Sequence, residues 1–361
     1  MSYKFFLISA PNLITFVLKI INVTSLYHRI PGLLLLIPLI AFTQSPLKTI
    51  TAEKGDGIYS LLRKQGLDPV KYYGSFLELN SERLQNGSEL FEGREYQIPY
   101  APDAIPEMGT TLELGSGTKY PIFGPGHEMV VPVSKRLEGT VYYLISGHGG
   151  PDPGAIENHN GKIIAEDEYA YDVTLRLAKL LLSHGAMVYI IIRDSNDGIR
   201  DERTLEMDDD EVTYPNEPIP LGQLERLEQR VDAVNKLYLK HRGAYQRLIV
   251  THVDSRNEGK NIDVFFYHHE KSKNGKHLAE SIHKTFEEKY RLYQPNRQYS
   301  GTFSDRSNLY MVKNTLPAMA YIEIGNLRNK KDQRRILDPE NRQALAKWIS
   351  EGVLLDYETR N

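Results

Sequence analysis

The sequence predicts an α/β domain built on a mostly parallel, twisted sheet flanked by helices, preceded by a small α+β domain. Two observations predict the large domain. From residue 140 onward, apolar runs alternate with amphipathic segments, which is the order of strands and helices in an α/β fold. These apolar runs are continuous, as in strands covered on both faces. A separate pattern of two short helices and a closing strand over residues 49–100 predicts the small domain.

Composition limits the kinds of site that the chain can build. The chain has 361 residues, 40% of them hydrophobic, and a formal net charge of −3, which suits two globular domains. This balance gives no indication of nucleic-acid binding, so we expect no such partner. The absence of cysteine excludes disulfides, thiolate zinc sites and cysteine nucleophiles. A metal would therefore need His, Asp and Glu ligands. The basic cluster Arg328 to Arg335 is interpreted as a solvated face near a helix start.

Residues 1–44 are predicted to be an export signal or an N-terminal anchor. The stretch GLLLLIPLIAF (residues 32–42) follows His28 and Arg29, an arrangement typical of the apolar core of a signal. It is shorter than the stretch of about 20 apolar residues that a transmembrane helix needs. Two alternatives stay open: a true start downstream of Met1, or a buried N-terminal helix. We expect membrane contact only through this segment, if it is not cleaved.

Residues 49–100 contain a Gly-Asp-Gly turn, a first helix over Ile58 to Lys64, a second near Pro69 to Leu79, and a closing strand in REYQIP. This pattern resembles a LysM domain, which is a two-helix, two-strand fold that binds glycans containing N-acetylglucosamine. The matching positions are Gly55, Asp56, Tyr59, Leu61, Gly66, Leu79, Asn80, Leu90, Gly93, Ile98 and Pro99. The alternative is a small packing domain that binds no glycan.

Residues 101–139 are rich in proline and glycine and are predicted to be a linker with a short strand or two. The large domain is predicted over residues 140–356. Its expected strands are 141–146, 187–192, 247–252, 262–267 and 319–324, and its expected helices are 168–185, 224–241 and 275–290.

Three polar residues stand at or near the carboxyl ends of predicted strands. His148 follows the first strand between glycines, His252 ends the strand 247–252, and Glu323 lies in the last strand. Ligands of open α/β sheets gather at this edge, so we expect the three side chains to converge. The glycines beside His148 allow a sharp turn and a close approach of the backbone. Glu323 in an apolar strand is costly unless its charge has a partner.

Glu166 is a fourth candidate because the next helix begins at the same edge of the sheet. Two imidazoles and one carboxylate suit a catalytic zinc ion that keeps one position open for water. Glu323 would then act as the general base toward that water. The adjacent Asp167 and Glu168 remain alternatives to Glu166.

Five stretches carry a resemblance to the zinc-dependent N-acetylmuramoyl-L-alanine amidases of the amidase_3 type, over about Val141 to Ser350. They are GHGGPDPGA, EDEYAYDVTLRLAKLL, LEQRVDAVN, VTHVDS and NLYMVKNTLPAMAYIEIGNLRN. The resemblance implies zinc ligands at His148, Glu166 and His252, the catalytic Glu323, and a structural Asn329. It also implies a role for Arg230, which we expect, with Arg306 and Asn308, to contact substrate or to form structural hydrogen bonds.

The resemblance implies hydrolysis of the amide between N-acetylmuramic acid and L-alanine in peptidoglycan. The LysM-like domain would bind the glycan strands, and the protein would be an exported monomer in the periplasm or envelope of a bacterium. Two alternatives stay open. One is a non-catalytic wall-binding protein or regulator with a relic amidase domain, and the other is a zinc peptidase that cuts within the stem peptide.

The sequence departs from the family pattern at three places. Ile145 and Ser146 stand where the family has Asp-Pro, Asp254 where Asn is usual, and Asn326 where Phe is preferred. An acidic stretch over residues 201–222 follows the second strand. It is interpreted as a solvated insertion in preference to a loop at the rim of the site. A calcium site there would lack a recognisable loop pattern.

Overall fold

The computed structural model describes residues 49–360, apart from 66, 68, 100–116 and 256–260. The predicted export segment and the first part of the predicted linker lie outside the described residues. No helix of the described chain combines the length and the apolar character needed to cross a membrane.

The small N-terminal unit contains two helices and an antiparallel strand pair. Its elements are β1 (Thr49–Thr51), α2 (Ile58–Lys64), α3 (Pro69–Leu79) and β2 (Glu95–Gln97), with β1 paired to β2. Both helices lie where the sequence predicts them. The Asn80 side chain closes the unit, because its Nδ2 donates to the carbonyls of Phe76 and Gln97 while its Oδ1 accepts from the Gln97 N–H. Leu61, Phe76 and Tyr96 are fully buried in its core.

The large domain is built on a six-stranded sheet in the order β14-β13-β15-β12-β5-β8. The strands are β5 (Thr140–Ser146), β8 (Met187–Ile190), β12 (Tyr245–Asp254), β13 (Phe265–His268), β14 (Thr302–Asp305) and β15 (Ala318–Asn326). Strands β8, β5, β12 and β15 are parallel to one another, whereas β13 and β14 run in the opposite direction. The mostly parallel sheet that the sequence predicts is confirmed.

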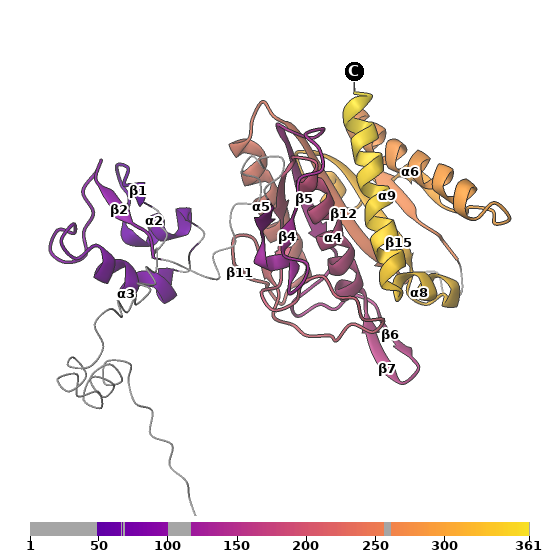
Figure 1. Ribbon diagram of the computed structural model, residues 1–361, viewed down its shortest axis with the longest axis horizontal. Coiled ribbons are helices and arrows are strands. Elements are labelled where there is room, and N and C mark those ends of the chain that lie inside the picture. The colour runs from indigo at the N-terminus through magenta and orange to yellow at the C-terminus, as the bar shows by residue number, and fades with distance from the viewer. Residues whose placement is uncertain (1–48, 66, 68, 100–116, 256–260, 361) are drawn as a thin grey trace, which may run out of the picture. The chain divides into compact units, whose positions relative to one another are not determined.

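Helices cover both faces of this sheet (Figure 1). They are α4 (Glu166–Ser183), α5 (Gln223–Lys240), α6 (Lys273–Tyr293), α7 (Tyr310–Asn314), α8 (Lys330–Ile336) and α9 (Pro339–Glu358). Side chains alternate along β5, so that Tyr142 and Leu144 pack with α4, α6 and α9, while Tyr143 and Ile145 pack with α5 and α7. This double coverage explains why the strands are apolar throughout.

The strand predicted over residues 187–192 divides into two strands. Strand β8 stays in the main sheet, and β9 (Ile192–Arg193) joins β10 (Val212–Thr213) and β11 (Glu217–Pro218) in a separate three-stranded sheet. Ile191 lies at the junction: its N–H donates to the Leu144 carbonyl, and its own carbonyl accepts from the Tyr214 N–H. The change of partner after Ile191 ends the pairing of this segment with β5.

The described part of the predicted linker belongs to the large domain. It forms β3 (Thr118–Lys119), a short 3-10 helix (Pro121–Phe123) and β4 (Met129–Val130). Tyr120, Phe123, Val130 and Leu137 are buried in the same core as α4. Residues 118–137 are therefore folded structure within the large domain. Prolines and glycines dominate the composition of this segment, but the apolar side chains between them find a core to enter.

The basic cluster Arg328 to Arg335 is a solvated face only in part. The Arg335 side chain is 12% exposed and pairs at 3.3 Å with Asp263, whose side chain is fully buried. Arg335 also donates to the Tyr290 hydroxyl at 2.6 Å. A buried carboxylate needs a cation within reach, and this requirement draws Arg335 inward. Asn329 caps the start of α8 by accepting from the N–H groups of Lys331 and Asp332, which fits its expected structural role.

Candidate active site

The turn after β5 explains why His148 stands among glycines. A Cβ atom built on Gly147 would lie 2.3 Å from the His252 ring, and one on Gly154 would lie 2.6 Å from the His148 ring. His148 itself adopts a φ of 63°, in the left-handed region. The glycines therefore leave the space that the two imidazoles occupy, and the backbone of this turn passes directly beneath the rings.

Glu166 is the first residue of α4 and is only 5% exposed. Its Oε1 accepts from the Val253 N–H at 3.0 Å and lies 2.9 Å from Nδ1 of His252. Its Oε2 accepts from the Ala155 N–H at 3.1 Å and lies 3.4 Å from Nε2 of His148. The start of a helix also favours a carboxylate through the helix dipole. Glu166 is thus held between both histidines.

The structure brings His148, Glu166 and His252 together, with one possible ligand atom of each within 4.8 Å of the other two. The two imidazole rings lie nearly perpendicular, with centroids 5.0 Å apart. The His252 ring stacks on Tyr321 at 4.7 Å, which fixes its plane. Two imidazole nitrogens and a carboxylate oxygen on one side of a cavity fit zinc, which takes three such ligands in catalytic sites and leaves a position open.

A second layer of side chains fixes His148. Its Nδ1 lies 3.1 Å from Oδ2 of Asp152, and the same oxygen accepts from Arg226 at 2.8 Å. Arg230 donates to the backbone carbonyl of His148 at 2.7 Å. Sequence reasoning assigned no role to Asp152 or Arg226. The available signals were the placement of Asp152 four residues after His148 and of Arg226 one helical turn before Arg230.

The pKa values follow from burial and from these contacts. Burial lowers the pKa of His148, but the Asp152 and Glu166 carboxylates outweigh it and raise that pKa to about 10. Burial raises the pKa of Glu166, but His148 and His252 outweigh it and hold that pKa well below its usual range. Burial lowers the pKa of His252, and Glu166 offsets this only partly. The Asp152 and Glu166 carboxylates therefore favour a positive charge at the point where the two imidazoles and Glu166 meet.

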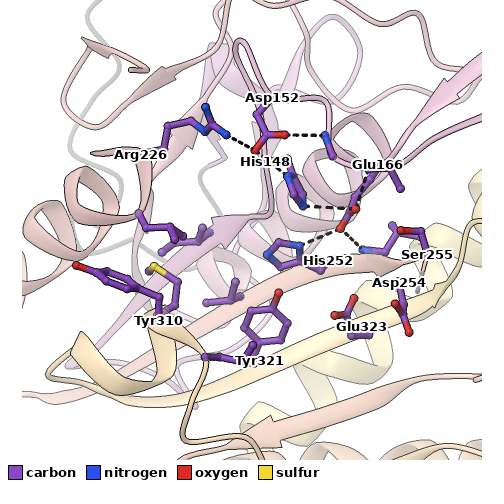
Figure 2. A pocket seen from close by; sticks show the side chains of 18 of the residues that line it. His148, Asp152, Glu166, Arg226, His252, Asp254, Ser255, Tyr310, Tyr321 and Glu323 are labelled. Atoms are coloured by element: carbon purple, nitrogen blue, oxygen red, sulfur yellow. Dashed lines mark hydrogen bonds and ion pairs between the residues drawn. The ribbon is translucent and has the colours of Figure 1, made fainter. Parts of the chain in front are cut away.

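The site opens into a cavity of about 670 Å³. Glu323 lines it from β15, in register with His252 on the neighbouring strand, and is 4% exposed. Figure 2 shows Glu323 on the Tyr321 side of His252, opposite Asp152 and Arg226. The expected general base thus shares one cavity with the three expected ligands.

The expected substrate contacts differ in their placement. Arg230 lines the cavity, and burial lowers its pKa to about 10. Neither Arg306 nor Asn308 is among the described residues that line the cavity. Arg306 instead lies over the Tyr267 ring at 5.1 Å. The neighbouring Tyr310 does line the cavity, although sequence reasoning did not single it out.

The acidic stretch over residues 201–222 is neither fully solvated nor at the rim. None of its described residues lines the cavity. Leu205 and Glu211 are buried, at 1% and 5% exposure. Glu211 accepts from the Gly150 N–H at 2.6 Å, and the Asp208 N–H donates to Glu168 on α4 at 3.2 Å. Helix α4 holds this stretch at two points: Arg176 pairs with Asp201 at 2.8 Å, and Glu168 accepts from the Asp208 N–H.

Comparison with known proteins finds several amidases that are similar to this chain. The curated relative "Germination-specific N-acetylmuramoyl-L-alanine amidase" of Bacillus subtilis (strain 168) is 26% identical over 227 residues, which are 62% of this chain and 82% of the relative. The structure of the CwlD amidase from Clostridioides difficile in complex with the GerS lipoprotein is similar at 18% identity and a TM-score of 0.45, over 62% of this chain and 100% of that one. The amidase AmiC2 of Nostoc punctiforme is similar at 18% identity and a TM-score of 0.42, over 63% of this chain and 99% of that one.

Residues 143–354 match the family Amidase_3, described as N-acetylmuramoyl-L-alanine amidase. This match spans more than half of the chain. The protein therefore belongs to the Amidase_3 family and is an amidase of the N-acetylmuramoyl-L-alanine class, which hydrolyses peptidoglycan.

Proposed function

We propose that the protein is a zinc-dependent enzyme that cleaves the amide between N-acetylmuramic acid and L-alanine, with zinc held by His148, Glu166 and His252. One observation carries the proposal: three ligand atoms of the preferred types lie within 4.8 Å of one another beside an open cavity. The contact between Asp152 and Nδ1 of His148 supports it, because metal-binding histidines usually pair their second nitrogen with a carboxylate.

A bound zinc ion supplies a Lewis acid that polarises a carbonyl and lowers the pKa of water. The side chains of this protein would do the rest. Glu323 accepts a proton from the attacking water as the new C–O bond forms at the lactyl carbonyl carbon. Glu323 then delivers that proton to the amide nitrogen as the C–N bond breaks. The products are a lactyl carboxylate on the glycan and a stem peptide with a free L-alanine amine.

The two alternatives make different demands on the same site. A relic domain would not need to keep all four candidate residues, yet His148, Glu166, His252 and Glu323 are all present and share one cavity. A peptidase that cuts within the stem peptide would use the same zinc chemistry. It would release shortened peptides and leave L-alanine attached to the glycan, so product analysis separates it from the amidase.

The small N-terminal unit is proposed to bind glycan strands as a LysM-like domain. Support comes from the order of its elements, in which two helices lie between two paired strands. Binding to the wall would raise the local concentration of enzyme near its substrate. We further propose that the protein is exported to the periplasm or cell envelope and acts as a monomer.

The substitution Glu323→Gln tests the mechanism. It keeps the shape of the side chain but removes the base, so turnover of purified sacculi by the full chain should fall by about 10²- to 10⁴-fold. Zinc content, measured by elemental analysis, should stay at the wild-type level. The matched control is Glu280→Gln on the exposed side of α6, which should leave turnover unchanged. Wild-type turnover by the Glu323→Gln variant would refute the assigned role.

A further inference from the structure

A second group of carboxylates lies behind the candidate zinc site. Asp167 and Glu168 follow Glu166 in the first turn of α4, and Glu211 stands immediately before β10. They are 1%, 2% and 5% exposed. One carboxylate oxygen of each lies within 4.8 Å of the other two. Segments more than forty residues apart in sequence thus bring three acidic groups to one buried point.

The described residues do not balance the charge of this group. Arg200 contacts Glu168 at 2.7 Å but also pairs with Asp197. Asp167 accepts from the Glu168 N–H through Oδ1, whereas its buried Oδ2 accepts no hydrogen bond from any residue that the structure describes. A buried carboxylate oxygen without a donor is strongly unfavourable, so the position calls for a further partner.

We propose that Asp167, Glu168 and Glu211 bind a hard divalent cation of the calcium class. All three metal ligands would be carboxylate oxygens. Calcium-class cations prefer oxygen ligands, whereas zinc binds nitrogen and sulfur more readily. Calcium–oxygen distances of about 2.3–2.6 Å allow ligand oxygens to lie up to about 5 Å apart, and the observed separations are within 4.8 Å.

The cation would join three parts of the domain. Glu211 already accepts from Gly150 in the turn that carries His148, and Asp167 directly follows Glu166. The ion would therefore fix the acidic stretch to the start of α4 and to the His148 turn. The proposed hydrolysis assigns no role to the acidic stretch, whereas cation binding does. The stability of the candidate zinc site would then depend on a second metal.

The test is calcium binding by the full chain, stripped with chelator and then saturated with zinc. Equilibrium dialysis should find one tightly bound Ca²⁺ per chain, and Ca²⁺ should raise the unfolding temperature. The Glu211→Gln variant should weaken calcium binding at least tenfold while retaining zinc, because its amide oxygen still accepts from Gly150. Asp167→Asn should act in the same way and serves as the second variant if Glu211→Gln fails to fold.

The control is Glu206→Gln, an exposed change in the same acidic stretch that should leave calcium binding unchanged. His252→Ala should lose zinc and keep calcium, which separates this site from the proposed catalytic one. The proposal is overturned if Ca²⁺, Mg²⁺ and Mn²⁺ all fail to bind to the zinc-loaded chain. It is also overturned if calcium binding survives both carboxylate variants or disappears with Glu206→Gln.

Discussion

His148 illustrates how much of the site depends on single contacts. Its backbone has a φ of 63°, an unfavourable conformation for a residue with a side chain. Three groups hold it there: Asp152 on Nδ1, Glu166 on the Nε2 side and Arg230 on the backbone carbonyl. The imidazole is thus oriented without a bound metal ion, as a preformed metal-binding site requires.

Asp152→Asn should lower zinc affinity by about 10- to 100-fold, because the amide no longer offers His148 a charged acceptor. A competition titration with a chromophoric chelator measures this affinity. The control is Asp209→Asn, an exposed change that contacts neither His148 nor Arg226. Equal zinc affinities for wild type and Asp152→Asn would show that Asp152 does not position the ligand.

The buried carboxyl of Asp194, directly after β9, should make the stability of the domain depend on pH. Burial raises its pKa to about 6, above the ordinary value of 3.8. Between these values the folded state binds more protons than the unfolded state, so the stability that Asp194 contributes is full below pH 3.8 and declines as pH rises through 6. In chelator, Asp194→Asn should flatten this part of the stability curve, measured by urea unfolding at several pH values. An unchanged slope would contradict the assignment.

At the scale of elements, the candidate site gathers at the ends of β5 and β12 and at the start of α4. The turn after β5 supplies His148, the first residue of α4 supplies Glu166, and the neighbouring strand β12 supplies His252. Parallel strands end at one edge of the sheet, so the side chains at their carboxyl ends lie close together whatever the sequence of the connecting loops. The glycines of the turn are a further requirement, because two rings pack directly against its backbone.

Gly154→Ala should distort the site beyond its effect on the backbone. Gly154 has a φ of 68°, and its Cβ would meet both the His148 ring and Glu166. Gly139 is the matched control, because it has a φ of 79° and open space around its Cβ. Both alanine variants should lose stability through backbone strain, by about 1–2 kcal/mol. Only Gly154→Ala should also lose zinc affinity, and equal affinities for the two variants would contradict the packing argument.

The elements with a clear period could be predicted from sequence. The helix that became α4 shows the 3.6-residue period, and the run that became β5 is apolar on both faces. The reversed direction of β13 was not predicted. Only ten residues separate β12 from β13, which is fewer than a parallel crossover needs. The short connection could therefore have indicated that β13 runs in the opposite direction.

Part of the candidate site could also be predicted. The ends of β5 and β12 predicted the meeting of His148 and His252. Periodicity says nothing about Asp152 and Arg226, whose partners depend on how α5 packs.

At the scale of the whole molecule, the chain joins a small unit with its own core to a domain of the amidase family. The proposed division of labour is binding to the wall by the first and hydrolysis by the second. The near-neutral charge of −3 gives no long-range attraction to an anionic wall. Wall binding should therefore depend on specific glycan contacts and little on salt.

The Glu323→Gln variant allows this division to be measured without hydrolysis. Its sedimentation with purified sacculi should be inhibited by soluble oligomers of N-acetylglucosamine and should change little between low and physiological salt. A maltose oligomer of the same length serves as the control sugar and should have no effect. Binding that both sugars leave intact, or that salt abolishes, would argue against a LysM-like role for the small unit.

The most direct test of the central claim is the product analysis of sacculi digested by the zinc-loaded full chain. Mass spectrometry should find stem peptides that begin with a free L-alanine amine, together with glycan strands that carry bare lactyl groups. Both products should disappear with chelator and return with zinc. Peptides cut within the stem, or products that form equally well in chelator, would contradict the proposed zinc amidase.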